Sequence, residues 1–170
     1  DRPLIANELS DNDMKQAAFV FLATSLVGGY LSGFYAFFSI LAFTALYHIY
    51  SAPPTRFKLI PFFSTFIIGL CNLSAALAGF FIISNSKTLS LFPVEAIVGI
   101  VIFFSLLPNI RDIKDIAGDT RAGILTVPVL FGPILGPKVV GVMAAIAYLT
   151  VPFFIKIYWL FVFAIPAAIA

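Results

Sequence analysis

Three aspartates in one short segment are the residues of this chain best suited to chemistry. Asp112, Asp115 and Asp119 lie in the segment 109–132 and are spaced i, i+3 and i+7. On one continuous helix they would fall within a wedge of about 60°, where like charges repel one another. A hard divalent cation such as Mg²⁺, which prefers oxygen ligands, would relieve this repulsion. The alternative is a solvated polar loop between two membrane helices.

The rest of the chain is almost entirely apolar. Of its 170 residues, 61% are hydrophobic and 11% are charged, whereas a soluble domain is about half apolar and a quarter charged. We therefore predict an all-α, polytopic transmembrane helix bundle. The basic residues are scattered over loops rather than clustered, so we expect no nucleic-acid partner. The single cysteine, Cys71, lies inside an apolar run and excludes a disulfide framework.

Charge-free runs and helix breakers place six membrane spans. Residues 16–55 carry no formal charge, and one helix of that length would be about twice as long as the hydrocarbon layer is thick. The run must therefore fold back near Gly33. The resulting spans are residues 16–32, 34–50, 62–84, 93–110, 139–155 and a truncated 157–170. The Gly- and Pro-rich segment 122–137 is predicted to be interfacial, and we expect one transmembrane domain that is a segment of a longer chain.

The basic residues also predict which side of the membrane carries the aspartates. Alternating spans place residues 1–15, 50–58 and 109–138 on one side, together with eight of the ten basic residues. By the positive-inside rule this side is cytoplasmic. We therefore expect an integral membrane protein with its active-site mouth at the cytoplasmic surface.

The aspartate segment forms part of a longer pattern. From Asp112 onward it is D-x-x-D-x-x-G-D-x-x-x-G-x-x-T-x-P-V, which resembles the second aspartate-rich motif of the UbiA superfamily of intramembrane prenyltransferases. Arg2-Pro3-Leu4 followed by Ser10 is similar to the family's RPL…S segment. The loop YSAPPTRFK, residues 50–58, is similar to the family's YSxPPxRxK loop. The three pieces occur in the family's order, and the resemblance runs through the whole sequence.

The resemblance implies both a fold and an activity. The fold would be a nine-helix bundle, of which this chain covers the third helix to part of the eighth. The activity would be Mg²⁺-dependent transfer of an isoprenyl group from a prenyl diphosphate to an aromatic or lipid acceptor within the membrane. The expected partners are the prenyl diphosphate, a hydrophobic acceptor, membrane lipids and the missing helices of the same protein. We expect these 170 residues alone to be inactive.

The family's site residues can be carried over to matching positions. Three residues would be catalytic and bind Mg²⁺: Asp112, Asp115 and Asp119. Four basic residues would hold diphosphate oxygens: Arg56, Lys58, Arg111 and Arg121. Three weaker candidates would contact the isoprenyl tail or the acceptor: Tyr47, Tyr50 and Asn72. The two tyrosine rings could shield an allylic carbocation through cation–π attraction, whereas Asn72 could equally be a packing contact between helices.

Two departures from the family pattern limit the comparison. The family's first motif, NDxxDxxxD, would precede Asp1 and is absent, so half of the metal site is missing from this sequence. The ubiquinone-pathway members carry YxxxK in the fourth loop, where Pro54 stands here, which disfavours a 4-hydroxybenzoate acceptor.

Two other functions compete with this interpretation of the sequence. A CDP-alcohol phosphotransferase-like enzyme would need a DGxxAR…GxxxDxxxD pattern, which this sequence does not supply. A non-enzymatic transporter or channel fragment would bind its solute near the bilayer midplane. The predicted spans hold almost no charge, so an interfacial enzyme is favoured.

Overall fold

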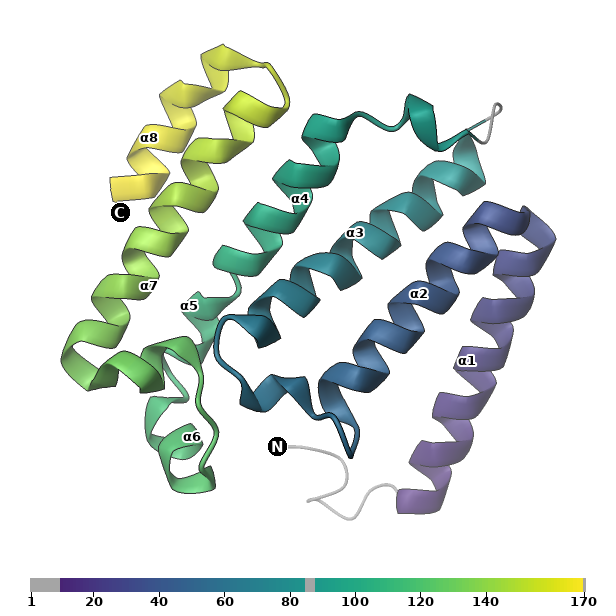
Figure 1. The fold of residues 1–170 in the computed structure, drawn as a ribbon, viewed down its shortest axis with the longest axis horizontal. Coiled ribbons are helices and arrows are strands. Elements are labelled where there is room, and N and C mark those ends of the chain that lie inside the picture. Colours follow the sequence, from purple (N-terminus) through teal and green to yellow (C-terminus); the bar gives the residue numbers. More distant parts are fainter. Residues whose placement is uncertain (1–9, 85–87, 170) are drawn as a thin grey trace.

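The chain folds into helices joined by short loops (Figure 1). The computed structural model describes residues 10–84 and 88–169, and these ranges contain α-helices and 3₁₀ turns but no strand. The long helices are α1 (Asp11–Ser32), α2 (Phe34–Ser51), α3 (Phe63–Ile83), α4 (Val94–Leu106) and α7 (Val127–Phe154). The shorter elements are η1 (Phe57–Leu59), η2 (Leu89–Leu91), α5 (Asn109–Asp112), α6 (Ile116–Ala122), η3 (Tyr158–Leu160) and α8 (Phe161–Ile169). The predicted all-α class is confirmed.

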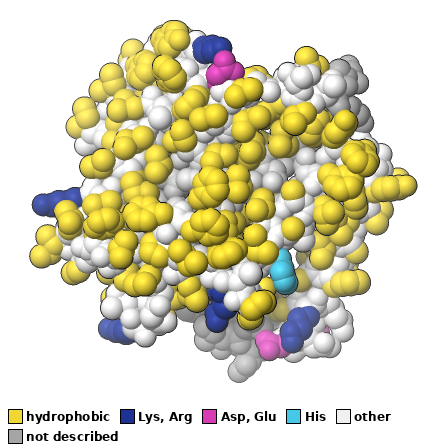
Figure 2. All heavy atoms as spheres, viewed as in Figure 1, with side chains coloured by type: hydrophobic (Ala, Val, Ile, Leu, Met, Phe, Trp, Pro, Cys, Tyr) yellow, Lys and Arg dark blue, Asp and Glu magenta, His cyan; other side chains and the backbone are white. Residues whose placement is uncertain are grey.

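Within residues 10–84 and 88–169, five helical segments are long and apolar enough to cross a membrane: Asp11–Ser32, Phe34–Ser51, Phe63–Ile83, Val94–Asp112 and Val127–Phe154. The sixth predicted span corresponds to a shorter apolar helix, Tyr158–Ile169. Hydrophobic side chains cover most of the face shown in Figure 2, and charged side chains lie mainly near its edges. Such a surface suits lipid, which unlike water imposes no cost on exposed apolar groups. The molecule is therefore a polytopic helix bundle.

A capping box determines where α1 begins, and a glycine separates α1 from α2. Ser10 Oγ accepts a hydrogen bond from the Asp13 backbone N–H, and the Asp13 carboxylate accepts one from the Ser10 N–H, each at 3.2 Å. Two otherwise unpaired N–H groups are thereby satisfied, so α1 begins at Asp11 rather than at the predicted residue 16. Gly33 has φ 122° and ψ 167° and is the one residue between α1 and α2. This positive φ is readily adopted only by glycine.

The long helices form a row in the order of the chain. Figure 1 shows α1, α2, α3, α4, α7 and α8 side by side, and each packs against the next. Helices α3 and α4 approach closely at Gly69. A Cβ atom there would meet Ser105 Oγ and lie 2.7 Å from the Val101 carbonyl oxygen.

Helix α7 starts earlier than the predicted residue 139. It begins at Val127 and bends at Gly132, which has φ 78° and ψ 174°. Pro133 follows the bend directly and so opens the longer arm, where its missing N–H leaves no hydrogen bond unmade. The segment predicted to be interfacial is thus largely the start of a kinked helix.

Two groups of contacts stabilise the bundle, one at each end of its long helices. Val127, Val140 and Met143 of α7 form a buried cluster on which Leu106 and Ile113 pack, so α7 supports the segment that carries the aspartates. The α5–α6 segment and the α2–α3 loop lie at the same end of the bundle, the lower end in Figure 1. At the other end, Lys156 Nζ donates to Glu95 Oε1 at 2.6 Å, and this hydrogen bond raises the pKa of Lys156.

Candidate active site

The aspartate segment is broken into short helical pieces. Pro108 lacks an N–H group, and the regular helix α4 ends just before it, at Leu106. Asp112 ends α5, Asp119 lies within α6, and Asp115 joins them with φ −98° and ψ 1°. The prediction of one helix face carrying all three carboxylates within about 60° is therefore wrong. The spacing rule assumes an unbroken helix, which this segment does not form.

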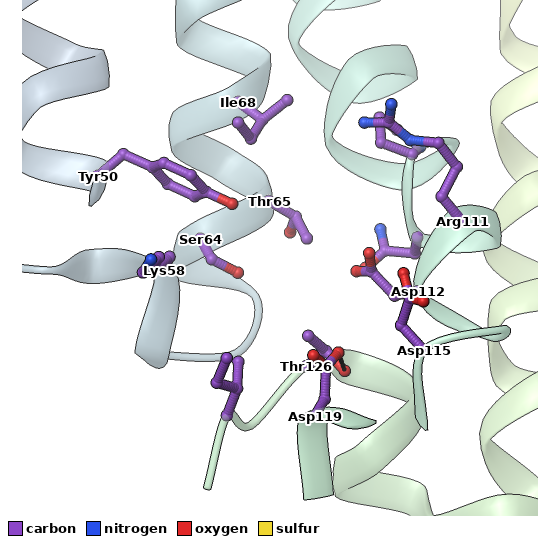
Figure 3. Close-up of a pocket in the computed structure, with 13 residues that line it drawn as sticks. Tyr50, Lys58, Ser64, Thr65, Ile68, Arg111, Asp112, Asp115, Asp119 and Thr126 are labelled. Atoms are coloured by element: carbon purple, nitrogen blue, oxygen red, sulfur yellow. Dashed lines mark hydrogen bonds between the residues drawn. The ribbon is translucent and has the colours of Figure 1, made fainter. Parts of the chain in front are cut away.

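All three carboxylates nevertheless line one pocket. Its volume is about 250 Å³, and it lies between the α2–α3 side and the α5–α6 side of the bundle. Figure 3 shows Tyr50, Lys58 and Ser64 on one wall and Arg111, Asp112 and Asp115 on the opposite wall. The complete lining is Tyr50, Lys58, Ser64, Thr65, Ile68, Pro108, Asn109, Arg111, Asp112, Asp115, Asp119, Ile124 and Thr126. The broken backbone thus replaces the helix face as the means of gathering the carboxylates.

The charges in this pocket act on one another without forming close ion pairs. Asp112 is half-buried, and the charges of Asp119, Arg111 and Asp115 all act on its carboxylate. Within residues 10–84 and 88–169, the one ion pair closer than 4.0 Å joins Lys156 and Glu95 at the far end of the bundle. The carboxylates of the pocket are therefore not neutralised by a neighbouring basic side chain.

Uncharged oxygen groups complete the lining. Thr126 Oγ1 donates a 3.4 Å hydrogen bond to Asp119 Oδ2, which helps to orient that carboxylate. Asn109 is completely buried, and its Oδ1 lacks a hydrogen-bond partner among the described residues. Ser64 and Thr65 bring two hydroxyl groups from α3. Sequence analysis missed Asn109, Ser64 and Thr65; an amide three residues before Asp112, beside a proline, was the signal available for Asn109.

The structure separates the predicted diphosphate contacts into two groups. Lys58 and Arg111 line the pocket, whereas Arg56 and Arg121 do not. Arg56 has a left-handed backbone, with φ 42° and ψ 49°, just before η1. Arg121 is exposed near the end of α6. Of two basic residues in the same loop, only Lys58 therefore lies in the pocket lining.

Of the three residues predicted to contact the isoprenyl tail or the acceptor, one lines the aspartate pocket and two lie outside its lining. Tyr50 lines the pocket, whereas Tyr47 stands outside it, with its ring nearly parallel to that of Phe43 at a centroid distance of 6.3 Å. The two tyrosine rings lie 6.0 Å apart. Asn72 donates a 2.9 Å hydrogen bond to the Ile68 carbonyl and lines a neighbouring cavity of about 470 Å³.

This second cavity adjoins the first and is mainly apolar. The two share Ile68, Pro108 and Arg111 as lining residues, so Arg111 stands at their boundary. The other lining residues are Asn72, Phe104, Leu107, Ile110 and Tyr148. The charged pocket at one end of the bundle thus lies next to this second cavity, an apolar chamber lined from α3, α4, α5 and α7.

The donor set decides which kind of ion the pocket could hold. In the described part of the chain, no three His, Cys, Asp or Glu side chains lie close enough together to form a metal-binding group by themselves. The pocket does contain carboxylate, amide and hydroxyl oxygens and no sulfur or imidazole ligand. Such a set suits a hard cation that completes its coordination with water or ligand oxygens.

Solved structures of one archaeal protein, a UbiA homolog from Archaeoglobus fulgidus, resemble this fold. Its structure bound to GPP and Mg²⁺ has a TM-score of 0.74 and 23% sequence identity, covering 98% of this chain and 59% of that one. Its structure bound to DMAPP and Mg²⁺ has a TM-score of 0.70 and 25% identity, covering 88% and 50%. Its structure bound to Cd²⁺ has a TM-score of 0.74 and 21% identity, covering 98% and 63%. The chain thus spans between half and about three-fifths of the length of that protein.

Comparison at the level of sequence gives a more specific result. No curated protein matches the chain. The model of the UbiA prenyltransferase family, however, matches residues 1–170. Because this match extends over the full sequence and the fold agrees with that of an archaeal homolog, the chain belongs to the UbiA prenyltransferase family.

Proposed function

We propose that the protein transfers an isoprenyl group from a prenyl diphosphate to a hydrophobic acceptor, aromatic or lipid, with Mg²⁺ as cofactor. The observation that supports this most directly is the pocket in which Asp112, Asp115 and Asp119 lie across from Lys58. The pocket shares three lining residues with the apolar chamber beside it, and the chain belongs to the UbiA prenyltransferase family. The homolog structures bound to GPP or DMAPP with Mg²⁺ support the same class of ligand.

The residues present fit Mg²⁺. The ion is commonly held by one or two protein carboxylates together with substrate phosphates and water, so a compact group of three carboxylates is not required. In this proposal Asp112, Asp115 and Asp119 hold Mg²⁺. When bound, the ion would supply positive charge that stabilises the leaving diphosphate.

The chain's own cations hold the diphosphate. Lys58 and Arg111 approach the pocket from different sides and can each donate charge-assisted hydrogen bonds to phosphate oxygens. Their positive charges stabilise the negative charge that grows as the carbon–oxygen bond breaks. Arg56 and Arg121 lie outside the pocket lining and would act only as more distant charges.

The apolar chamber takes the isoprenyl tail. Its volume of about 470 Å³ and its Phe104, Leu107 and Ile110 lining suit a branched hydrocarbon chain. Tyr50 stands in the lining of the diphosphate pocket, where its ring can face positive charge at the reacting carbon. Tyr47 would support the Tyr50 ring, and Asn72 would contact the tail or the acceptor.

Release of diphosphate from geranylgeranyl diphosphate by the full-length protein in detergent, rather than by these 170 residues alone, tests this proposal. We expect release to require Mg²⁺ and to stop when EDTA is added. Asp112→Ala and Asp115→Ala should each lower the rate roughly 10²-fold or more, since each removes an oxygen ligand from the charge-stabilising site.

Glu95→Gln is the matched control, because it removes a carboxylate at the opposite end of the bundle. Its rate should stay close to that of the parent. Unchanged release by both aspartate variants would show that the metal assignment is wrong.

A further inference from the structure

Asn109 is the buried polar residue that the proposed reaction leaves unexplained. It is the first residue of α5, its side chain is 0% exposed, and it lines the pocket together with Asp112. The two residues stand three positions apart on a single helical turn and so share one side of it. A buried amide at this place needs partners for both its nitrogen and its oxygen.

The nitrogen of the amide has a structural role. Asn109 Nδ2 donates to the carbonyl oxygens of Ser105 at 2.9 Å and Leu106 at 2.8 Å. These carbonyls lie at the end of α4, where the helix lacks further backbone donors. The two bonds also fix the orientation of the amide, because exchanging nitrogen and oxygen would set a carbonyl oxygen against two others.

The oxygen of the amide is not explained by that role. With both Nδ2 hydrogens directed at α4, the planar amide must direct Oδ1 away from α4. Oδ1 is buried and has no hydrogen-bond partner among the described residues. A buried acceptor without a partner is costly, so such a group is expected to meet a ligand. The oxygen belongs to a side chain that lines the aspartate pocket.

We propose that Asn109 Oδ1 is a neutral oxygen ligand of the divalent cation in this pocket, alongside Asp112. The inference rests on the proposed function, which places a divalent cation among the aspartates. An amide oxygen is a hard ligand, and it adds no negative charge to carboxylates that already repel one another. It also adds a protein ligand where carboxylates alone do not form a three-residue metal group.

Binding of Mg²⁺ to the full chain in detergent, without substrate, tests the inference. The rise in thermal midpoint with Mg²⁺ concentration gives an apparent affinity, and an EPR titration of free Mn²⁺ gives an independent one. Asn109→Ala should weaken both affinities about tenfold or more.

Asn109→Asp keeps an oxygen at this position but loses the Nδ2 donors. This variant should have a lower thermal midpoint without Mg²⁺ and should still be stabilised by the ion. Ser105→Ala is the control, because Ser105 Oγ is also buried and has no hydrogen-bond partner in the described part of the chain, but lies outside the pocket lining.

The possible results separate the roles. If Asn109→Ala lowers the midpoint but binds Mg²⁺ as the parent does, or if Asn109→Ala and Asn109→Asp lose binding equally, the residue only caps α4 and the inference fails. Should Asn109→Ala not fold, the Asn109→Asp result decides alone: retained stabilisation by Mg²⁺ supports the oxygen ligand, and its loss overturns it.

Asp112→Asn distinguishes the two proposals. If it binds Mg²⁺ normally, the metal site of the proposed function is itself wrong; if it binds weakly while Asn109→Ala does not, only the present inference is lost.

Discussion

At the scale of single residues, two cations in one loop differ although their sequence contexts are alike. Arg56 and Lys58 both belong to the YSAPPTRFK segment, and sequence analysis predicted both to hold diphosphate. The left-handed backbone at Arg56 precedes the 3₁₀ turn Phe57–Leu59, and only Lys58 lines the pocket. The difference arises from backbone dihedral angles, which residue type and spacing do not specify.

Lys58→Gln should therefore raise the KM for the prenyl diphosphate. Loss of a hydrogen bond to a charged group costs about 1.5–3 kcal/mol, or roughly 10- to 100-fold in affinity. Arg56→Gln is the matched control. Because Arg56 is exposed, we expect its substitution to change KM by about threefold at most. Steady-state kinetics on both variants checks the difference. Equal effects of the two substitutions on KM would contradict the conclusion that Lys58 lines the pocket and Arg56 does not.

At the scale of elements, sequence patterns predicted where helices lie better than where they bend. Span 34–50 corresponds to α2, Phe34–Ser51, because a glycine precedes it and a proline pair follows it. Gly132 lies in the Gly- and Pro-rich segment 122–137, which was predicted to be broken, whereas the breaks at Pro108 and Asp115 were not predicted. Each lies in an apolar or helix-compatible context, and tertiary packing decides whether such a residue bends a helix or ends it. The pocket residues contributed by α3 depend on helix packing, which composition alone cannot specify.

Two glycines of α3 allow the close approach of α3 and α4 to be tested. A Cβ at Gly69 would collide with Ser105 and Val101 of α4, whereas a Cβ at Gly79 would meet no atom within 4 Å. Gly69→Ala should lower the free energy of unfolding by roughly 1–3 kcal/mol through overpacking. Gly79→Ala should raise it by up to about 1 kcal/mol, since alanine reduces the entropy of the unfolded chain. Thermal midpoints in detergent measure both, and a loss of the same size at the two positions would contradict the close crossing.

At the scale of the whole molecule, charge separates the two ends of the bundle. The pocket and the basic residues Lys58, Arg111 and Lys114 lie at the end that carries the α2–α3 loop and the α5–α6 segment. Lys156 stands at the other end, paired with Glu95. By the positive-inside rule we propose that the pocket faces the cytoplasm. The family and the sidedness could be proposed from motifs and loop charges, whereas the pocket required the three-dimensional arrangement.

Cysteine labelling tests this orientation. The single native cysteine, Cys71, is buried and should react slowly. Introduced cysteines in intact cells can therefore be assayed with a membrane-impermeant maleimide. Lys156→Cys should label from outside, whereas Lys114→Cys should label only after the membrane is permeabilised. The reverse pattern would place the pocket on the outer surface.

The row of helices, in which each packs on the next, bears on how the protein is made. Since α1 meets α2, α2 meets α3 and α3 meets α4, each new helix finds its partner among those already synthesised. Such nearest-neighbour contacts close short loops and favour rapid folding. The α4–α7 pairing, by contrast, forms after the ribosome has passed the aspartate segment that separates these two helices. The pocket wall formed by α2 and α3 is accordingly synthesised before the wall that carries the aspartates, and the pocket forms when the second wall packs against the first.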